Sequence, residues 1–272
     1  MTIQEIIDSL ERLAPLDLQD SFDNAGLQIG LCDGKGFGIN DSECTGVLVC
    51  LDVTEAVIDE AAVKGCNLIV SHHPLIFRPL RRVAGQTWQE RCVVKAILNG
   101  IAIYSAHTNL DNAPDGVNYK IADILGLDNI QWLEEKPGAE AGSGIIGDMT
   151  SLMDEAQFIS SLKEAFGVDC IAHSATKDRW VRKVAVCGGA GAFLLPKAVE
   201  MGADCFVCGE FSYHNYFDAD GAYDGQGILL AELGHYQSEQ FTMNLIRKWL
   251  LDNFFNLKVI LTEINTNPII FN

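Results

Sequence analysis

Short apolar runs alternate along the chain with longer stretches whose apolar residues recur at helical spacing. Residues 46–51 and 67–71 have the length and β-branched content of buried strands, whereas residues 54–64 and 87–98 have the period of helices. Strands that alternate with helices of ten or more residues are typical of βαβ units. The pattern therefore predicts an α/β fold.

The rest of the chain continues this alternation. Further helices are expected near residues 3–13, 116–125, 153–165, 191–201 and 236–252, and further strands near 101–105, 169–173, 182–187, 204–208, 227–231 and 257–263. Residues 136–147 are glycine-rich and predict a turn-prone connection.

Two parts of the chain share one plan. Residues 47–73 align without a gap with residues 184–210, with six identities in 27 positions. Further along, His107-x-x-x-Asp111 matches His235-x-x-x-Glu239, each after an apolar strand. The repeat predicts a duplicated α/β unit with pseudo-twofold symmetry, although any two βαβ units share some likeness. We expect a first half at residues 1–130, a second at 131–272 with its tail packing back on the first, and one cleft between them.

Composition narrows the class of protein. The 272 residues include 19 basic and 37 acidic side chains, a formal net charge of −18. Such a charge disfavours nucleic acid and anionic membrane surfaces as partners and suits cation capture. No apolar run approaches the ~20 residues that span a bilayer, and the acidic amphipathic start does not resemble a secretory signal. Nine cysteines, mostly in strand-like runs, indicate buried thiols and a cytoplasmic location.

Ligand-type side chains gather where strands end. His72 and His73 follow an apolar strand directly, and His235 and Glu239 are spaced to share one helical face. Any one of these histidines alone is better interpreted as a satisfied polar group at a strand end. Together, in an acidic chain, they favour a metal site, because imidazole and carboxylate suit Zn, Mn or Fe. A bridging carboxylate would allow two ions ~3.5–4 Å apart.

Other motifs carry weaker signals. Asp23 and Asn24 could orient a ligating imidazole or form a turn before a strand. The glycines of residues 188–191 favour tight turning over phosphate binding, because the fingerprint of a phosphate loop is missing. Cys205-x-x-Cys208 lies in a strand-like run, where positions three apart point to opposite faces, which argues against a redox pair. His214 is expected on a helix, as a proton shuttle, a substrate contact or a surface residue.

The segments FDNAGLQIG, LIVSHHPLIF, AHTNLDNAPDGVN, VAVCGGAG and GHYQSEQ, in this order, resemble the NIF-three-like family of dinuclear metal-centre proteins, often named GTP cyclohydrolase 1 type 2 homologs. The resemblance covers nearly the whole chain. It implies two interlinked α/β domains in a toroidal homohexamer, with the metal sites facing an inner cavity. Many members have a longer insertion between the halves, so this chain resembles the compact form.

Carried over to this sequence, the resemblance implies a ligand set for two divalent ions, with Glu239 as the bridge and His107 as a further pocket histidine. The implied metal ligands are His72, His73, Asp111, His235 and Glu239.

We therefore expect a dinuclear metal-dependent hydrolase. A metal-bridging hydroxide would attack a nucleotide-like or other anionic small molecule, with His107 or His214 transferring the proton. For GTP the attacked atom would be C8 of the purine. The alternatives are a non-catalytic metal-binding regulatory scaffold and a metal-dependent phosphoesterase. The residues identify neither the native metal nor the substrate.

Overall fold

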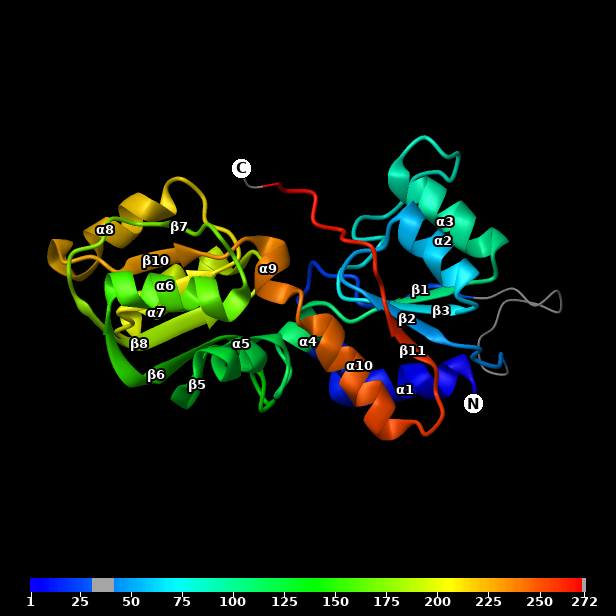
Figure 1. Ribbon diagram of the computed structural model, residues 1–272, viewed down its shortest axis with the longest axis horizontal. Helices are drawn as coiled ribbons and strands as arrows, with labels where there is room; N and C mark the ends of the chain where they lie inside the picture. Colours follow the sequence, from blue (N-terminus) through cyan, green and yellow to red (C-terminus); the bar gives the residue numbers. More distant parts are fainter. Residues whose placement is uncertain (31–41, 271–272) are drawn as a thin grey trace. The chain divides into compact units, whose positions relative to one another are not determined.

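The computed structural model describes residues 1–30 and 42–270 and divides them into two compact units, each built on one β-sheet (Figure 1). The first unit comprises Met1–Leu110 and Phe241–Ile270, and the second begins at Asp111 and ends at Gln240. The tail thus belongs to the first unit. The first boundary precedes the expected one at residue 131, because the helix at Val117–Leu125 packs on the second sheet.

The first unit contains a five-stranded sheet in the order β1-β4-β3-β2-β11. Strands β2, β3, β4 and β11 run parallel, and β1 pairs antiparallel with β4. The strands are β1 (Gly26–Ile29), β2 (Val47–Cys50), β3 (Leu68–Ser71), β4 (Ala102–Ser105) and β11 (Val259–Leu261). The helices are α1 (Ile3–Leu13), α2 (Glu55–Val63), α3 (Trp88–Leu98), α4 (Thr108–Asp111) and α10 (Thr242–Asn253), with a 3-10 turn at Leu16–Leu18.

Helices cover both faces of this sheet. Helices α2 and α3 pack on one face, and α10 contacts β2 and β11 and packs on α1; in Figure 1 the two pairs lie above and below the strands. Every residue of β2, β3 and β4 is buried, as expected for parallel strands covered on both sides. Thr2 and Glu5 form a capping box at the start of α1, which fixes where this helix begins.

The second unit contains a six-stranded sheet in the order β5-β6-β8-β9-β10-β7. Strands β8, β9 and β10 run parallel, and the other pairings are antiparallel. The strands are β5 (Leu127–Glu135), β6 (Gly142–Asp154), β7 (Ala172–His173), β8 (Trp180–Cys187), β9 (Cys205–Cys208) and β10 (Leu229–Glu232). The helices are α5 (Val117–Leu125), α6 (Glu155–Phe166), α7 (Leu195–Glu200), α8 (Asn215–Gly225) and α9 (His235–Glu239), with a 3-10 turn at Gly191–Leu194.

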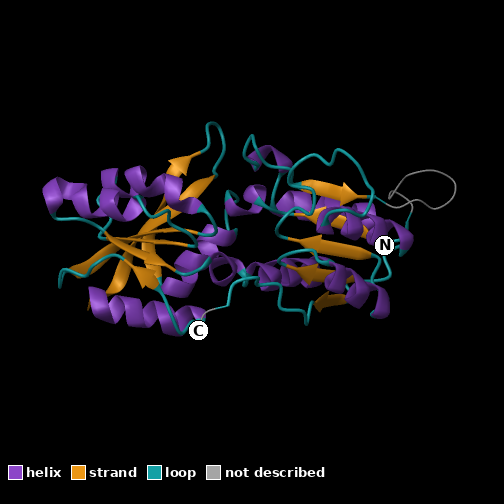
Figure 2. Cartoon of the chain, turned by 90° about the horizontal axis from the view of Figure 1, so that it is seen from above, coloured by secondary structure: helices purple, strands orange, loops and turns teal. Residues whose placement is uncertain are grey.

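Helices α5 and α6 pack on β6 and β8. Helices α7 and α8 contact each other, and α7 also contacts β5 while α8 contacts β10. Figure 2 shows the strands of each unit flanked by helices. An apolar cluster that includes Phe206, Leu230 and Ala198 joins α7 and α8 to the sheet. Each unit therefore has its own core, and the α/β class predicted from the periodicity is confirmed.

Several sequence predictions differ from the structure. The glycine-rich stretch 136–147, expected as a connection, runs through the β5–β6 hairpin and into β6. A Cβ at Gly142 would lie 2.5 Å from the carbonyl oxygen of Glu134, so glycine here permits close strand pairing rather than a turn. The single helix expected near 236–252 is two helices, α9 and α10, and the strands β1, β5 and β6 were not expected.

The predicted repeat is present in the strand registers. Val47 lies opposite Leu68 in the first sheet, and the aligned Val184 lies opposite Cys205 in the second. The next strand is also equivalent in the two sheets. Strand β4 pairs in parallel with β3 over four residues, and β10 pairs in parallel with β9 over four residues. The two units therefore share a core of three parallel strands in the same register.

The described cysteines are free thiols, and Cys32 lies outside the described residues. Cys205 and Cys208 are both buried in β9, and burial raises the pKa of the Cys208 thiol to about 12. This environment fits a core position and not a redox pair. No helix within residues 1–30 and 42–270 combines the length and apolarity needed to cross a bilayer.

Candidate metal centre

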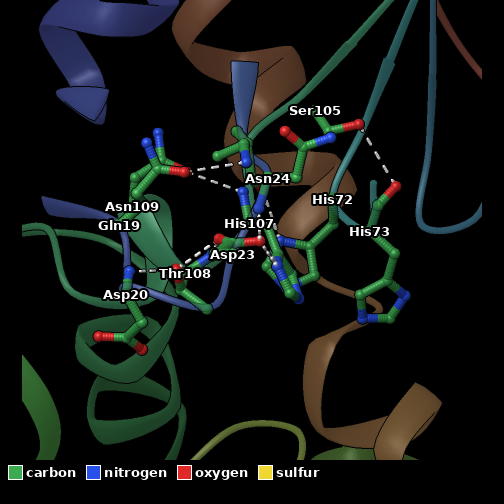
Figure 3. Close-up of polar contacts among 12 residues, drawn as sticks. Gln19, Asp20, Asp23, Asn24, His72, His73, Ser105, His107, Thr108 and Asn109 are labelled. Carbon is green, nitrogen blue, oxygen red and sulfur yellow. Dashed lines mark hydrogen bonds and ion pairs between the residues drawn. The ribbon is translucent and has the colours of Figure 1, made fainter. Parts of the chain in front are cut away.

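Three histidines meet at the carboxyl edge of the first sheet. His72 and His73 follow β3 directly, and His107 comes two residues after β4. Because β3 and β4 are parallel neighbours, their carboxyl ends lie side by side. The ring centroids are 4.9 Å apart for His72 and His73, 5.4 Å for His72 and His107, and 5.5 Å for His73 and His107. Figure 3 shows the three rings converging.

A hydrogen bond at Nδ1 orients each imidazole of the pair. His72 Nδ1 lies 2.8 Å from the carbonyl oxygen of Ala106, and His73 Nδ1 lies 2.7 Å from Asp52 Oδ1. Because a carbonyl oxygen only accepts, His72 Nδ1 carries the proton and donates it. In a neutral ring the acceptor nitrogen is then Nε2, which is the usual arrangement of a metal-binding histidine.

Asp23 holds the third histidine, which is one of the two roles that the sequence left open for this residue. Its Oδ1 lies 2.7 Å from His107 Nδ1, and its Oδ2 accepts the backbone N–H of Thr108 at 3.0 Å (Figure 3). Burial alone would raise the pKa of Asp23, but the hydrogen bond and charge of His107, together with hydrogen bonds from Thr108 and Asn24, lower it to about 2. The carboxylate is therefore ionised across the physiological range.

Asp52 orients His73, and sequence reasoning missed it. It follows β2 with Leu51 between them, and its Oδ2 also accepts the hydroxyl of Thr266 at 2.8 Å. Burial works to raise the pKa of Asp52, but the hydrogen bond from His73 and the charges of His73 and His72 lower it. Its position after a parallel strand was the signal that could have found it.

The second unit places a histidine and a carboxylate on one short helix. His235 begins α9 and Glu239 ends it, and His235 Nε2 lies 3.2 Å from Glu239 Oε2. His235 Nδ1 lies 2.9 Å from Glu210 Oε1, and Glu210 comes two residues after β9. Glu239 is buried. The predicted pairing of these two residues on one helical face is confirmed, with Glu210 as the carboxylate that orients the ring.

The glycine turn at residues 188–191 makes room for Glu239. Gly189 has a φ of +59°, and a Cβ there would lie 2.3 Å from Glu239 Oε1. The N–H of Gly189 donates to Ser238 Oγ at 3.0 Å, and Ser238 donates to the carbonyl oxygen of His235 at 2.8 Å. The turn therefore fixes α9 by close backbone approach, which agrees with the expectation of tight turning.

The other predicted site residues lie in less defined surroundings. Asp111 ends α4, and its carbonyl oxygen accepts the side-chain amide of Asn118 at 3.0 Å. His214 is the exposed residue that precedes α8, with the rings of Tyr213 and Phe217 beside it at 5.6 and 6.3 Å. The role of Asp111 as a metal ligand and the role of His214 as a proton shuttle stay predictions.

The donor set fits a divalent ion. Four histidines have Nδ1 next to an oxygen acceptor, the carbonyl of Ala106 or the carboxylates of Asp52, Asp23 and Glu210. Imidazole nitrogens with a buried carboxylate are ligands that Zn²⁺, Mn²⁺ and Fe²⁺ accept. Hydrogen bonds at Nδ1 also raise the basicity of the opposite nitrogen.

Known proteins resemble the chain over nearly all of its length. A family model described as Duf34/NIF3 (NGG1p interacting factor 3) matches residues 1–268. A protein of Lactococcus lactis subsp. lactis named GTP cyclohydrolase 1 type 2 homolog is 33% identical over 271 residues, with 98% of each chain covered. A protein of the same name from Clostridium perfringens is 32% identical, with 88% of this chain and 87% of that protein covered.

A solved structure extends the likeness to the fold. The Bacillus cereus protein related to NIF3 superposes with a TM-score of 0.86 at 26% identity, covering 100% of this chain and 99% of that one. The family match, the relatives and the strand-end histidines agree: this chain belongs to the Duf34/NIF3 family.

Proposed function

We propose that the protein is a divalent-metal-dependent hydrolase whose centre takes two ions and acts on a nucleotide-like or other anionic small molecule. The observation that supports the proposal is the engagement of Nδ1 in His72, His73 and His235, which makes Nε2 of each ring the nitrogen that would bind a metal. The proposed centre takes His72 and His73 from the first unit and Glu239 from the second.

The division of roles follows from the side chains. Glu239 is the proposed bridge, because a carboxylate has two oxygens and an imidazole presents one donor nitrogen. His235 and Asp111 complete the proposed ligand set. Ions bound by these residues would polarise an electrophile and would lower the pKa of bound water toward neutrality.

His107 is the proposed proton-transfer residue. Asp23 holds its Nδ1, so the ring keeps one orientation while it gains or loses a proton. His214 is the second candidate for this role. The relatives named GTP cyclohydrolase 1 type 2 homolog support a purine nucleotide as the first substrate to test, with C8 of the ring as the electrophile.

The first experiment measures metal per subunit in protein purified without added metal. We expect two divalent ions in the wild type and one or none in Glu239→Gln, which keeps the shape of the side chain but removes its charge. Glu164→Gln, an exposed position on α6, is the matched control and should retain both ions. Full occupancy in Glu239→Gln would disprove the bridging role.

The second experiment separates an enzyme from a scaffold. His107→Ala and His214→Ala leave the proposed ligands intact, so metal content should not change. Loss of a general acid or base typically lowers turnover by ~10²–10⁴-fold. Metal-loaded wild type that turns over neither GTP nor a panel of phosphoesters would favour the regulatory scaffold, and turnover of phosphoesters alone would favour the phosphoesterase. The homohexamer that the resemblance implies stays a prediction, and sedimentation tests it. The cytoplasmic location also stays a prediction.

A further inference from the structure

The loop after β3 concentrates positive charge in an acidic protein. Arg78, Arg81 and Arg82 are three of the 19 basic residues of a chain whose formal net charge is −18. All three are exposed, and they follow His73 by only five to nine positions. Arg78 and Arg81 form no ion pair with any residue in the described part of the chain. Their charges are thus available to an anion.

Hydrogen bonds hold the start of this loop in place. Asn24 Nδ2 donates to the carbonyl oxygen of Ile76 at 2.6 Å, and the N–H of Ile76 donates to Gln28 Oε1 at 3.2 Å. Ile76 and Leu80 both pack against the apolar core of the first unit. The exposed residues between Ile76 and Leu80 are therefore held in place at both ends.

A buried carboxylate fixes the far end. Glu90 accepts the backbone N–H groups of Ala84 and Gln86, each at 2.9 Å. The hydrogen bond from Gln86 lowers the pKa of Glu90 most. The hydrogen bond from Ala84 and the charge of Arg82 lower it further. The charge of Arg82 thus acts on Glu90 of the same loop. Arg78 and Arg81 are the two exposed arginines of the loop without such a partner among the described residues.

Two exposed aromatic rings link the arginines to the histidine cluster. The ring of Phe77 meets that of His107 edge-on, with centroids 6.0 Å apart and planes at 88°. Phe22, the neighbour of Asp23, meets Phe77 at 6.4 Å and 68°. The exposed fractions are 40% for Phe77 and 64% for Phe22. Exposed rings beside a polar site are typical of surfaces on which planar ligands stack.

We propose that this loop is the substrate-recognition surface, in which Phe77 and Phe22 stack a planar heteroaromatic ring and Arg78 and Arg81 bind phosphate. The ligand class is a nucleoside phosphate, and the inference rests on the proposed function in taking the adjacent histidines as the reaction centre. Guanidinium groups bind phosphate oxygens through paired, charge-assisted hydrogen bonds. An aromatic face accepts any base, so the loop selects the class and not one nucleotide.

The test is calorimetric binding of three probes to the full chain: GMP, guanosine and inorganic pyrophosphate. Arg78→Ala combined with Arg81→Ala should weaken GMP and pyrophosphate by about tenfold or more and leave guanosine unchanged. Phe77→Ala should weaken GMP and guanosine by about tenfold and leave pyrophosphate unchanged. Arg247→Ala, an exposed arginine on α10 in the same unit, is the charge control and should bind all probes as the wild type does.

Repeating the titrations after chelation separates this inference from the proposed function. If the arginine and phenylalanine effects persist in chelated protein that turns nothing over, the loop binds nucleotides whatever the reaction is. Equal losses in Arg247→Ala and the double variant would overturn the inference, because they would reflect net charge. It is likewise overturned if no probe binds the wild type, or if neither loop variant changes the affinity for GMP.

Discussion

The two units bring ligand-type residues to the same edge of matched parallel strands but hold them by different means. In the first unit, hydrogen bonds orient His73 and His107, and the carboxylate of Asp23 is fully buried. In the second, the carboxylate of Glu239 pairs with His235 and also lies against a glycine turn that leaves no space for a side chain at Gly189. A duplicated scaffold can thus keep its register while it changes how it preorganises a site.

The orienting carboxylates also differ in their surroundings. Glu210, which holds His235, has a side chain that is 51% exposed, whereas the Asp52 side chain is 35% exposed and is further tied to Thr266. Solvent weakens a charge-assisted hydrogen bond at an exposed position. Orientation in the first unit should therefore depend more on its carboxylates than orientation in the second.

The largest effect is expected where shape holds the site. In Gly189→Ala, a Cβ would lie 2.3 Å from Glu239 Oε1, so the carboxylate or the turn must move. We expect metal content to fall from two ions per subunit to one or none, measured by elemental analysis.

Gly202→Ala is the matched control. Its φ of +76° carries the same backbone strain, but nothing lies within 4 Å of the added Cβ. The protein should lose about 1 kcal/mol of stability from the left-handed conformation and keep its metal. Equal metal loss in both variants would show that backbone strain, and not the contact with Glu239, is responsible.

A smaller effect should distinguish the two sets of hydrogen bonds. Asp52→Asn removes the charge that orients His73, and loss of such a partner typically weakens metal binding by about 10- to 100-fold. Glu210→Gln makes the matching change at His235 and should cost less, because that position is more exposed. Competition with a chelator measures both affinities. A larger loss in Glu210→Gln would reverse the comparison.

The buried charge of Asp23 should appear in the pH dependence of stability. With a pKa lowered to about 2 in the folded state and about 3.9 in the unfolded chain, the carboxylate contributes about 2 kcal/mol above pH ~5. This contribution decreases as the pH falls and is about half gone by pH 3. Urea unfolding of chelated wild type and Asp23→Asn measures the difference, which should shrink toward low pH. A difference that grows on acidification contradicts the assignment.

The smallest effect is expected at the thiols, where both units should behave alike. Burial raises the pKa of Cys92 in the first unit to about 11 and of Cys208 in the second to about 12. Neither should react with iodoacetamide at pH 7.5 in the native state, whereas the exposed Cys170 should react. Mass spectrometry locates the label. Faster labelling of Cys208 than of Cys92 would show that the second core opens more readily.

Local patterns predicted much of the fold because the parallel strands are buried and nearly uniform. The β3 and β9 runs contain only buried residues, so their apolar sequence and their register could both be inferred. The β5–β6 hairpin could not be inferred, since Gly142 and Gly144 fit a strand only against specific neighbours across the sheet. Such tertiary contacts override the local preference of glycine for turns.

The candidate site was predictable to a similar degree. Ligand-type residues are recognisable from chemistry and spacing, as His235 and Glu239 show on α9. Residues that act through others are harder to find, because Asp52 and Gly189 become meaningful only when the chain brings them to His73 and Glu239. Asp23 was a candidate that stayed open between orienting an imidazole and forming a turn, because the sequence does not show that the chain brings it to His107.

The interrupted course of the first unit has a consequence for synthesis on the ribosome. Its strand β2 has two neighbours, β3 and β11, and β11 at Val259–Leu261 is synthesised after the whole of the second unit. The second unit, Asp111–Gln240, is one uninterrupted segment and is complete well before that. The nascent chain should therefore complete the sheet of the second unit first, which reverses the usual N-terminal-first order of folding. One edge of β2 stays unpaired until β11 has left the exit tunnel.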